Sequence, residues 1–183
     1  YTGSVPAING IMGNEWFDAQ KGKEVYCVED DSVQVVGGVA NSEPMSPKNL
    51  FTTTISDELR LATNFQSKVI GIAIKDRGSI LPAGHSGTAY WYEGGNGSFV
   101  SSTWYMQSLP EWAQKFNNKK IADSYYAKNW NTLYPIETYT QSDADNVPYE
   151  GKGADAAPVF PHQLQQFAGK NYGAIRATPF GNN

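Results

Sequence analysis

Three charged residues in succession follow a continuous apolar run in the sequence. Val69 to Ile74 carry no charge, and Lys75, Asp76 and Arg77 come directly after them. In open α/β sheets, ligands bind beyond the carboxyl ends of the strands. A Lys and an Arg two positions apart at that edge could therefore hold an anionic ligand. A solvated loop at the end of a strand is the other interpretation of the same charges.

Three further reactive side chains are better explained by structural roles. Residues 84–87 (Gly-His-Ser-Gly) resemble the serine-hydrolase elbow, but that elbow needs one residue between the Ser and the second Gly. We expect His85 to be a structural histidine beside the loop that follows the strand. His162 follows Pro161 and is expected to begin a helix, and Cys27 is expected to pack within a strand.

The sequence disfavours metal ligation within this chain. Two distant histidines and one cysteine give no zinc-ligand spacing, and one cysteine forms no internal disulfide. Asp143, Asp145 and Asn146 could chelate calcium, but they lack the Gly and the distal Glu of an EF-hand loop. A solvated acidic loop is the favoured interpretation, and no metal-binding residue is predicted.

Aromatic residues suggest a different class of function. Clustered on a surface they could stack on sugar rings, as in a glycan-binding module, whereas in the interior they would pack a helix against a hairpin. The packing role is favoured. The residues concerned are Trp91, Tyr92, Trp104, Tyr105, Trp112, Tyr125, Tyr126 and Trp130.

Composition limits the remaining classes. The 183 residues fit one domain, and a net charge of −4 argues against a nucleic-acid partner. With 17% charged and 13% aromatic residues, disorder is disfavoured. No apolar run reaches the roughly 18–20 residues that a membrane span needs. The chain begins at Tyr1 without a Met or a signal peptide, so we expect an internal piece of a larger protein.

The first half of the chain is expected to place the charged segment at the end of a strand. Residues 4–14 are expected to form a helical turn or loop, and 15–18 with 24–28 form a hairpin. Residues 55–65 are typical of a helix that buries Ile55, Leu59, Ala62 and Phe65 and that is capped by Ser56 and Asp57. Residues 69–74 then form a parallel strand buried on both faces.

The second half is expected to add a hairpin and helices. Residues 90–93 and 98–102 flank a Gly-Gly-Asn-Gly turn typical of a hairpin. A helix begins near Pro110, and its inner stripe is Trp112, Phe116 and Ile121. The elements expected to follow are a second short helix over 122–130, a loop over 132–161 and a helix over 162–167.

Two segments carry a family resemblance. Residues 1–14 (YTGSVPAINGIMGN) resemble the stretch just after the nucleophile in the alkaline phosphatase superfamily, whose pattern runs Thr-Gly-x-x-Pro-x-x-His-Gly-Ile-x-x-Asn. They are nearest the type I phosphodiesterase/nucleotide pyrophosphatase branch and the secreted bacterial monoesterase alkaline phosphatases. Residues 69–85 resemble the Lys-x-Arg segment of those monoesterases specifically. Further similarity at 109–112, 130–135 and 158–162 extends the resemblance over essentially the whole chain.

The resemblance implies a two-zinc phosphohydrolase in which a metal-activated Thr attacks phosphorus. Asn14 matches the Asn that donates to a phosphoryl oxygen, and Lys75 and Arg77 match the cationic pair that clamps the phosphoryl charge. Asn9 stands where the family has His, which we interpret as a structural difference. The Thr and the zinc ligands are expected outside these 183 residues. The implied substrates are small phosphate esters, and the implied location is periplasmic or secreted.

The predicted fold is α/β, with part of an alkaline phosphatase-like core (a parallel sheet with flanking helices) and an inserted hairpin-plus-helices cap. Within the single fragment 1–183, residues 1–86 and 158–183 are assigned to the core and 87–157 to the cap. The predicted parent is a zinc-dependent phosphomonoesterase. The alternatives are a phosphodiesterase/nucleotide pyrophosphatase of the same superfamily and a non-catalytic glycan- or partner-binding module. The isolated chain is expected to bind no zinc and to be inactive, and its oligomeric state is left open.

Overall fold

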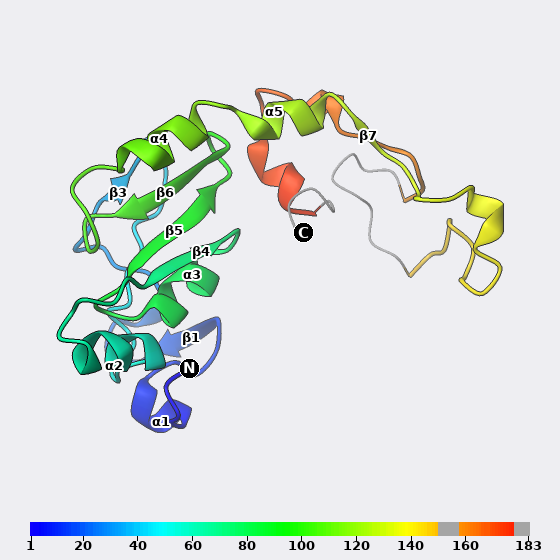
Figure 1. The fold of residues 1–183 in the computed structure, drawn as a ribbon. Coiled ribbons are helices and arrows are strands. Elements are labelled where there is room, and N and C mark those ends of the chain that lie inside the picture. The colour runs from blue at the N-terminus through cyan, green and yellow to red at the C-terminus, as the bar shows by residue number, and fades with distance from the viewer. Residues whose placement is uncertain (150–157, 178–183) are drawn as a thin grey trace.

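A computed structural model describes residues 1–149 and 158–177 (Figure 1). In chain order its elements are α1 (Pro6–Asn9), β1 (Glu15–Asp18), β2 (Lys23–Tyr26), β3 (Val35–Val36), α2 (Ile55–Ala62), β4 (Ile70–Ala73), α3 (Asp76–Ala83), β5 (Thr88–Glu93), β6 (Ser98–Ser102), α4 (Glu111–Asn117), α5 (Ile121–Tyr126), β7 (Asn129–Trp130), the 3₁₀ helix η1 (Ile136–Thr138), β8 (His162–Gln163), and the 3₁₀ helices η2 (Gln165–Phe167) and η3 (Tyr172–Ala177). Helices flank a sheet, which confirms the predicted α/β class.

The main sheet has four strands in the order β3-β6-β5-β4. β4 pairs with β5 in parallel, whereas the β5–β6 and β6–β3 pairs are antiparallel. The sheet is therefore mixed, and the predicted parallel pairing holds for one pair of the described strands. α3 connects the two parallel strands, because a parallel pair needs a crossover connection.

Side chains alternate across β5 and divide the core between the two faces of the sheet. Ala89 and Trp91 pack with Ile80 of α3 in one buried cluster. On the other face the Tyr90 ring lies edge-on to Trp112 of α4, with centroids 5.1 Å apart. Tyr92 joins a second cluster around α5 and the C-terminal 3₁₀ helices. Two layers of helix thus hold β5 at the centre of the sheet.

Three predictions of burial are wrong for the described residues. The apolar stripe of α2 is exposed, with Ile55 at 70%, because the polar side of that helix faces the core through buried Asp57. β4 is half-buried on the face that α3 covers, at Gly71 and Ala73, whereas Ile70 and Ile72 on the other face are more than half exposed. The predicted inner stripe of α4 and α5 is also exposed, with Trp112 at 51%.

The local elements follow the sequence signals where turns and caps are strong. Both predicted hairpins form, as β1–β2 and β5–β6. α4 begins after Pro110 as predicted, and α2 begins at Ile55. The cap of α2 is Thr54 rather than Ser56, with Asp57 completing a reciprocal capping box. The helix expected over 122–130 ends at Tyr126, where the short strand β7 follows.

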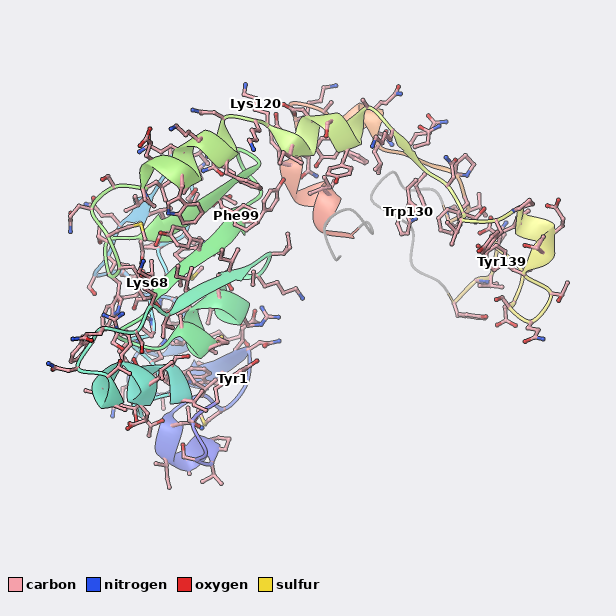
Figure 2. All side chains as sticks on the ribbon, viewed as in Figure 1. Tyr1, Lys68, Phe99, Lys120, Trp130 and Tyr139 are labelled. Atoms are coloured by element: carbon pink, nitrogen blue, oxygen red, sulfur yellow. The ribbon has the colours of Figure 1, made fainter. Side chains whose placement is uncertain are left out.

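Residues 127–149 and 158–163 belong to an arm that extends beyond α5, with Trp130 near its base and Tyr139 near its tip (Figures 1 and 2). The helix predicted over 162–167 is instead β8, which pairs with β7, followed by η2. At the base of the arm the rings of Trp130, Phe160 and His162 lie about 5 Å apart. This aromatic packing holds the two strands of the arm together.

The predicted boundary at residue 87 lies inside the sheet. β5 begins at Thr88 and pairs with β4, so the hairpin assigned to the cap is continuous with the core strand. Residues 150–157 and 178–183 of the predicted cap and core lie outside the described residues. The division of the whole protein into a core and a cap stays a prediction.

Candidate functional site

The junction of β4 and α3 positions the predicted cations. Lys75 is the N-cap residue of α3 and has extended backbone angles, so the strand passes into the helix without a loop. Gly71 lets the helix lie directly on the strand, because a Cβ at this position would lie 2.3 Å from the Ser79 carbonyl oxygen. The positive end of α3 is thereby fixed at the carboxyl end of β4. The sequence did not predict α3, because Gly78 and Pro82 within it are typical of loops.

A tyrosine from the β1–β2 hairpin holds Arg77. The Tyr26 hydroxyl donates to Asp76 Oδ1 at 2.5 Å and accepts from Arg77 Nη1 at 2.8 Å. The guanidinium carbon also lies 5.9 Å from the centre of the Tyr26 ring. Burial and the hydrogen bond to Asp76 raise the pKa of Tyr26, and the hydrogen bond from Arg77 raises the pKa of the arginine. The phenol is therefore neutral and the guanidinium is charged.

Both predicted cations are available to a ligand. Among the described residues, neither Lys75 nor Arg77 forms an ion pair with a carboxylate. Lys75 is exposed, and its ammonium group makes no hydrogen bond to any described residue. Arg77 uses one of its five N–H donors on Tyr26. Two positive charges at the positive end of a helix can bind an anion.

The same hairpin links Asn14 to the two cations. The Asn14 carbonyl oxygen accepts a hydrogen bond from the Cys27 amide at 2.9 Å, and the next residue, Glu15, pairs with Tyr26. The hairpin thus connects the Asn14 backbone to the residue that holds Arg77. Asn14 is exposed, and its side-chain amide makes no hydrogen bond within the described part of the chain. That amide is a free donor for a ligand.

The opposite end of α3 holds a saturated polar cluster around Asp57. This buried carboxylate accepts hydrogen bonds from the Ser86 hydroxyl at 2.7 Å and from the Ser86 amide at 2.8 Å. It also accepts from the amides of His85 and Thr54. Burial opposes ionisation of Asp57, but the Ser86 and other hydrogen bonds prevail and lower its pKa to about 2. The cluster ties the start of α2 to the loop after α3.

The cluster contains a Ser, a His and an Asp but cannot act as a catalytic triad. His85 Nε2 lies 2.8 Å from the Leu50 carbonyl oxygen and must be its donor, because a carbonyl only accepts. The other ring nitrogen faces Asp57, and Ser86 donates to Asp57 rather than to His85. No base is left to accept the serine proton. The interpretation of His85 as a structural residue is confirmed.

Asn9, Cys27 and His162 also have structural surroundings. The Asn9 side chain is buried, donates to the Ser4 carbonyl oxygen at 3.0 Å and accepts from the Ile11 amide. Burial raises the pKa of the Cys27 thiol to about 11, so the thiol is protonated at neutral pH. His162 packs between aromatic rings at the base of the arm. These positions serve packing and local hydrogen bonding.

The described residues do not fit the zinc sites that the resemblance implies. They contain no group of three or more His, Cys, Asp or Glu side chains placed to hold a metal ion. His85 is bonded to the Leu50 carbonyl oxygen. Of the acidic loop, Asp143 bonds the Tyr149 hydroxyl, and Asp145 accepts from the Phe160 amide. These described residues therefore offer no complete ligand set for zinc.

The aromatic residues are divided between the core and the surface. Trp91, Tyr92 and Tyr126 are at most 5% exposed, as the packing interpretation predicts. Trp104 is 39% exposed, but its indole N–H donates to the His85 carbonyl oxygen. Trp112 is exposed beside Tyr90. These contacts favour packing roles over a platform for sugar stacking.

The described residues contain no helix with the length and apolar character that a membrane span requires.

The sequence did not reveal Tyr26 as a residue of this candidate site. Its partner Asp76 was visible in the sequence because it lies between Lys75 and Arg77. Tyr26 is 51 positions before Arg77, and nothing in the local pattern distinguishes it from the other tyrosines. The alternation of polar and apolar residues predicts the strands of the β1–β2 hairpin, but it does not show that Tyr26 contacts Asp76 and Arg77. The contact follows from how the hairpin packs beside α3.

The chain is similar to known proteins over its whole length. The family model described as type I phosphodiesterase / nucleotide pyrophosphatase matches residues 1–158. The whole chain is 59% identical to alkaline phosphatase PhoV of Synechococcus elongatus, 54% to a calcium-transporting ATPase of Myroides odoratus and 50% to alkaline phosphatase PafA of Elizabethkingia meningoseptica. In each case the chain spans 34% of the relative's length.

Solved structures match equally well. The crystal structure of wild-type PafA superposes on all of this chain with a TM-score of 0.93 at 49% identity, and the match covers 36% of the PafA chain. A quadruple PafA variant, in which one Thr is changed to Ser and one Asn, one Lys and one Arg are changed to Ala, matches with the same TM-score at 48% identity. The described fold is therefore that of one third of a larger protein of known structure.

Proposed function

The chain belongs to the type I phosphodiesterase/nucleotide pyrophosphatase family of the alkaline phosphatase superfamily, and we propose that it supplies the phosphate-binding side of a phosphomonoesterase active site. The observation that carries this proposal is the pair of cations at the start of α3, Lys75 and Arg77, neither of which is paired with a carboxylate of the described residues. The chain spans about a third of its relatives' length, and the activity proposed is that of the full-length protein.

Substrate charge explains why two cations suit this reaction. The phosphoryl group of a monoester carries two negative charges, and charge is redistributed among its oxygens in the transition state. The planar guanidinium of Arg77 can donate to two oxygens at once, whereas the ammonium of Lys75 acts as a point charge. Because the helix and the hairpin hold these donors before substrate binds, little reorganisation is needed during reaction.

Asn14 adds a neutral donor to the proposed site. Its side-chain amide has two N–H donors and no protein partner among the described residues. We propose that it donates to a phosphoryl oxygen, while its carbonyl oxygen anchors the segment to the hairpin. A neutral donor stabilises a developing charge without attracting competing anions as strongly as a third cation would.

The quadruple PafA variant supports these assignments. Its altered Lys and Arg are two positions apart, like Lys75 and Arg77, and its altered Asn precedes that Lys by nearly the same number of residues as Asn14 precedes Lys75. The altered Thr precedes the Asn. In line with the family resemblance, we propose that this Thr type of nucleophile and two zinc ions act in the complete protein. The zinc ions would lower the pKa of the nucleophile and stabilise the negative charge on the leaving oxygen. Residues outside this chain would hold them.

The partners and the location follow the same proposal. The substrates are small phosphate esters rather than nucleic acids, because the net charge of −4 disfavours a polyanion. A periplasmic or secreted location is proposed from the family resemblance. One relative is named as a calcium-transporting ATPase. ATP also has a highly charged terminal phosphoryl group, so we propose it as a further substrate to be assayed with the full-length protein.

The test uses the full-length protein that contains this chain. Lys75→Ala and Arg77→Ala should each lower kcat/KM for p-nitrophenyl phosphate on the order of 100-fold, as expected when one transition-state donor is lost. Lys120→Ala, which removes a cation from the start of α5, is the matched control and should leave the rate unchanged. Unchanged kinetics in both test variants would overturn the roles. Separately, the isolated 183-residue chain should turn over no monoester with or without zinc.

A phosphodiesterase is the second candidate, because the matching family model carries that description. A diester has one negative charge fewer on phosphorus and carries a second substituent. Two cations therefore match a monoester better than a diester. If the full-length protein hydrolyses methyl p-nitrophenyl phosphate faster than p-nitrophenyl phosphate, the diesterase assignment is correct and the monoesterase proposal is wrong.

A further inference from the structure

Arg77 is a long, flexible cation whose guanidinium is held by Tyr26. An arginine side chain loses rotamer entropy when it is fixed in one orientation. In this chain the Tyr26 hydroxyl accepts from Arg77 Nη1 at 2.8 Å. This is the sole side-chain hydrogen bond of the guanidinium within the described residues. The orientation of Arg77 therefore depends on one phenol.

The orientation of that phenol is itself fixed. A tyrosine hydroxyl has one proton to donate, and in Tyr26 this proton goes to Asp76 Oδ1 at 2.5 Å. The lone pairs of the oxygen are left to accept from Arg77. Asp76 Oδ1 also accepts from the Arg77 backbone amide, which holds the carboxylate at the first turn of α3. The three groups form a chain in which each hydrogen bond has one possible direction.

A neutral link has a chemical advantage over a direct ion pair. A carboxylate bonded to the guanidinium would offset its charge and compete with phosphate for its fork of N–H groups. Here Asp76 acts through Tyr26, so Arg77 keeps its charge and four of its five donors. The raised pKa of Tyr26 keeps the hydroxyl protonated in alkaline solution as well.

We propose that Tyr26 is a positioning residue for Arg77, and that its hydroxyl, oriented by Asp76, aims the guanidinium at the phosphoryl group. The inference rests on the proposed function, because it assigns Tyr26 a part in binding the same phosphoryl group. Tyr26 also lies opposite Glu15, beside Asn14, so one hairpin sets the relative position of the Asn and Arg donors. Among the described residues the Tyr26 hydroxyl itself bonds only Asp76 and Arg77, so its removal should affect the rate through Arg77 alone.

The first experiment is a double-mutant cycle in the full-length protein. Tyr26→Phe keeps the ring and removes the hydroxyl, and should lower kcat/KM for p-nitrophenyl phosphate roughly tenfold, as expected for a hydrogen bond to a charged group. In an Arg77→Ala background the same change should lower it less than twofold. In a Lys75→Ala background the tenfold effect should remain. Equal effects in all three backgrounds would overturn the proposal.

Two further measurements separate positioning from a loss of structure. The loss in Tyr26→Phe should be larger for p-nitrophenyl phosphate than for methyl p-nitrophenyl phosphate, and the inhibition constant of inorganic phosphate should rise. Tyr105→Phe is the matched control, since that hydroxyl bonds the Gly84 carbonyl oxygen away from Arg77, and its rate should be unchanged. Asp76→Asn should give a smaller loss of the same kind. An equal loss for both esters in Tyr26→Phe would contradict positioning.

The outcomes distinguish this inference from the function on which it rests. If Arg77→Ala itself leaves monoesterase activity unchanged, the proposed role of Arg77 fails, and positioning by Tyr26 fails with it. If Arg77→Ala lowers the activity about 100-fold and Tyr26→Phe has no effect, or an additive one, only the positioning role is overturned.

Discussion

The two ends of α3 carry contrasting polar groups. The C-terminal end has the residue types of a catalytic triad, yet Asp57, His85 and Ser86 satisfy one another and the Leu50 carbonyl oxygen. The N-terminal end has a plain Lys-x-Arg segment in which the cations have no carboxylate partner among the described residues. Residue type alone would favour the C-terminal end as the functional site. Unused hydrogen-bonding capacity favours the N-terminal end as the candidate ligand site.

The largest expected effect is on stability and comes from disrupting the Asp57 cluster at the C-terminal end of α3. Asp57→Ala removes the acceptor of five hydrogen bonds from Thr54, His85 and Ser86 and leaves these buried or half-buried donors without a partner. We expect the free energy of unfolding of the full-length protein to fall by about 3 kcal/mol. Denaturant unfolding measures this. kcat per folded molecule should stay within about threefold, since the cations lie at the other end of α3. A normal stability would contradict the role of the cluster.

The second prediction concerns pH. Hydrogen bonds from Ser86 and its neighbours outweigh burial and lower the pKa of Asp57 from 3.8 to about 2. Because the folded pKa is the lower one, Asp57 contributes stability above pH 4, and this contribution is lost as the pH falls from about 4 to about 2. The loss should be about 2 kcal/mol.

Asp30 has a lowered pKa as well, so the test is a comparison. Acid unfolding of the full-length protein is measured beside Asp57→Asn, which cannot titrate. Between pH 4 and pH 2 the variant should lose less stability than the wild type. Parallel curves would show that Asp57 titrates normally.

The smallest effect sharpens the contrast between the two ends. Ser86→Ala removes the hydroxyl that donates to Asp57 and should lower the free energy of unfolding by about 1 kcal/mol. It should leave p-nitrophenyl phosphate turnover unchanged. Lys75→Ala should show the reverse pattern, with stability changed by less than about 0.5 kcal/mol and the rate reduced. A loss of turnover in Ser86→Ala would mean that the hydroxyl has a catalytic role.

Local signals in the sequence predicted the two hairpins and α2, but not which faces of these elements are buried. The hairpins at 15–26 and 88–102 follow from alternation and glycine turns, and the Lys75–Arg77 site follows from charges after an apolar strand. Burial of the α2 stripe was predicted wrongly because periodicity identifies an apolar face without showing what packs on it. α3 was missed because tertiary packing on Gly71 outweighs the low helix propensity of Gly78 and Pro82.

The residues of the candidate site divide in the same way. Asn14, Lys75 and Arg77 could be named from the sequence because the family resemblance lies in contiguous segments. Tyr26 could not, since its contact joins positions about fifty residues apart through the packing of the hairpin on α3. A positioning role depends on geometry across the chain, and geometry of that kind has no local sequence signature.

The most direct test of the account is the ester preference of the double variant Lys75→Ala/Arg77→Ala in the full-length protein. kcat/KM is measured for p-nitrophenyl phosphate and for methyl p-nitrophenyl phosphate. If the N-terminal end of α3 binds the dianionic phosphoryl group, monoester hydrolysis should fall by at least about 100-fold and diester hydrolysis by much less. An equal fall for both esters, or no fall, would contradict the claim that these two cations recognise the charge of a phosphate monoester.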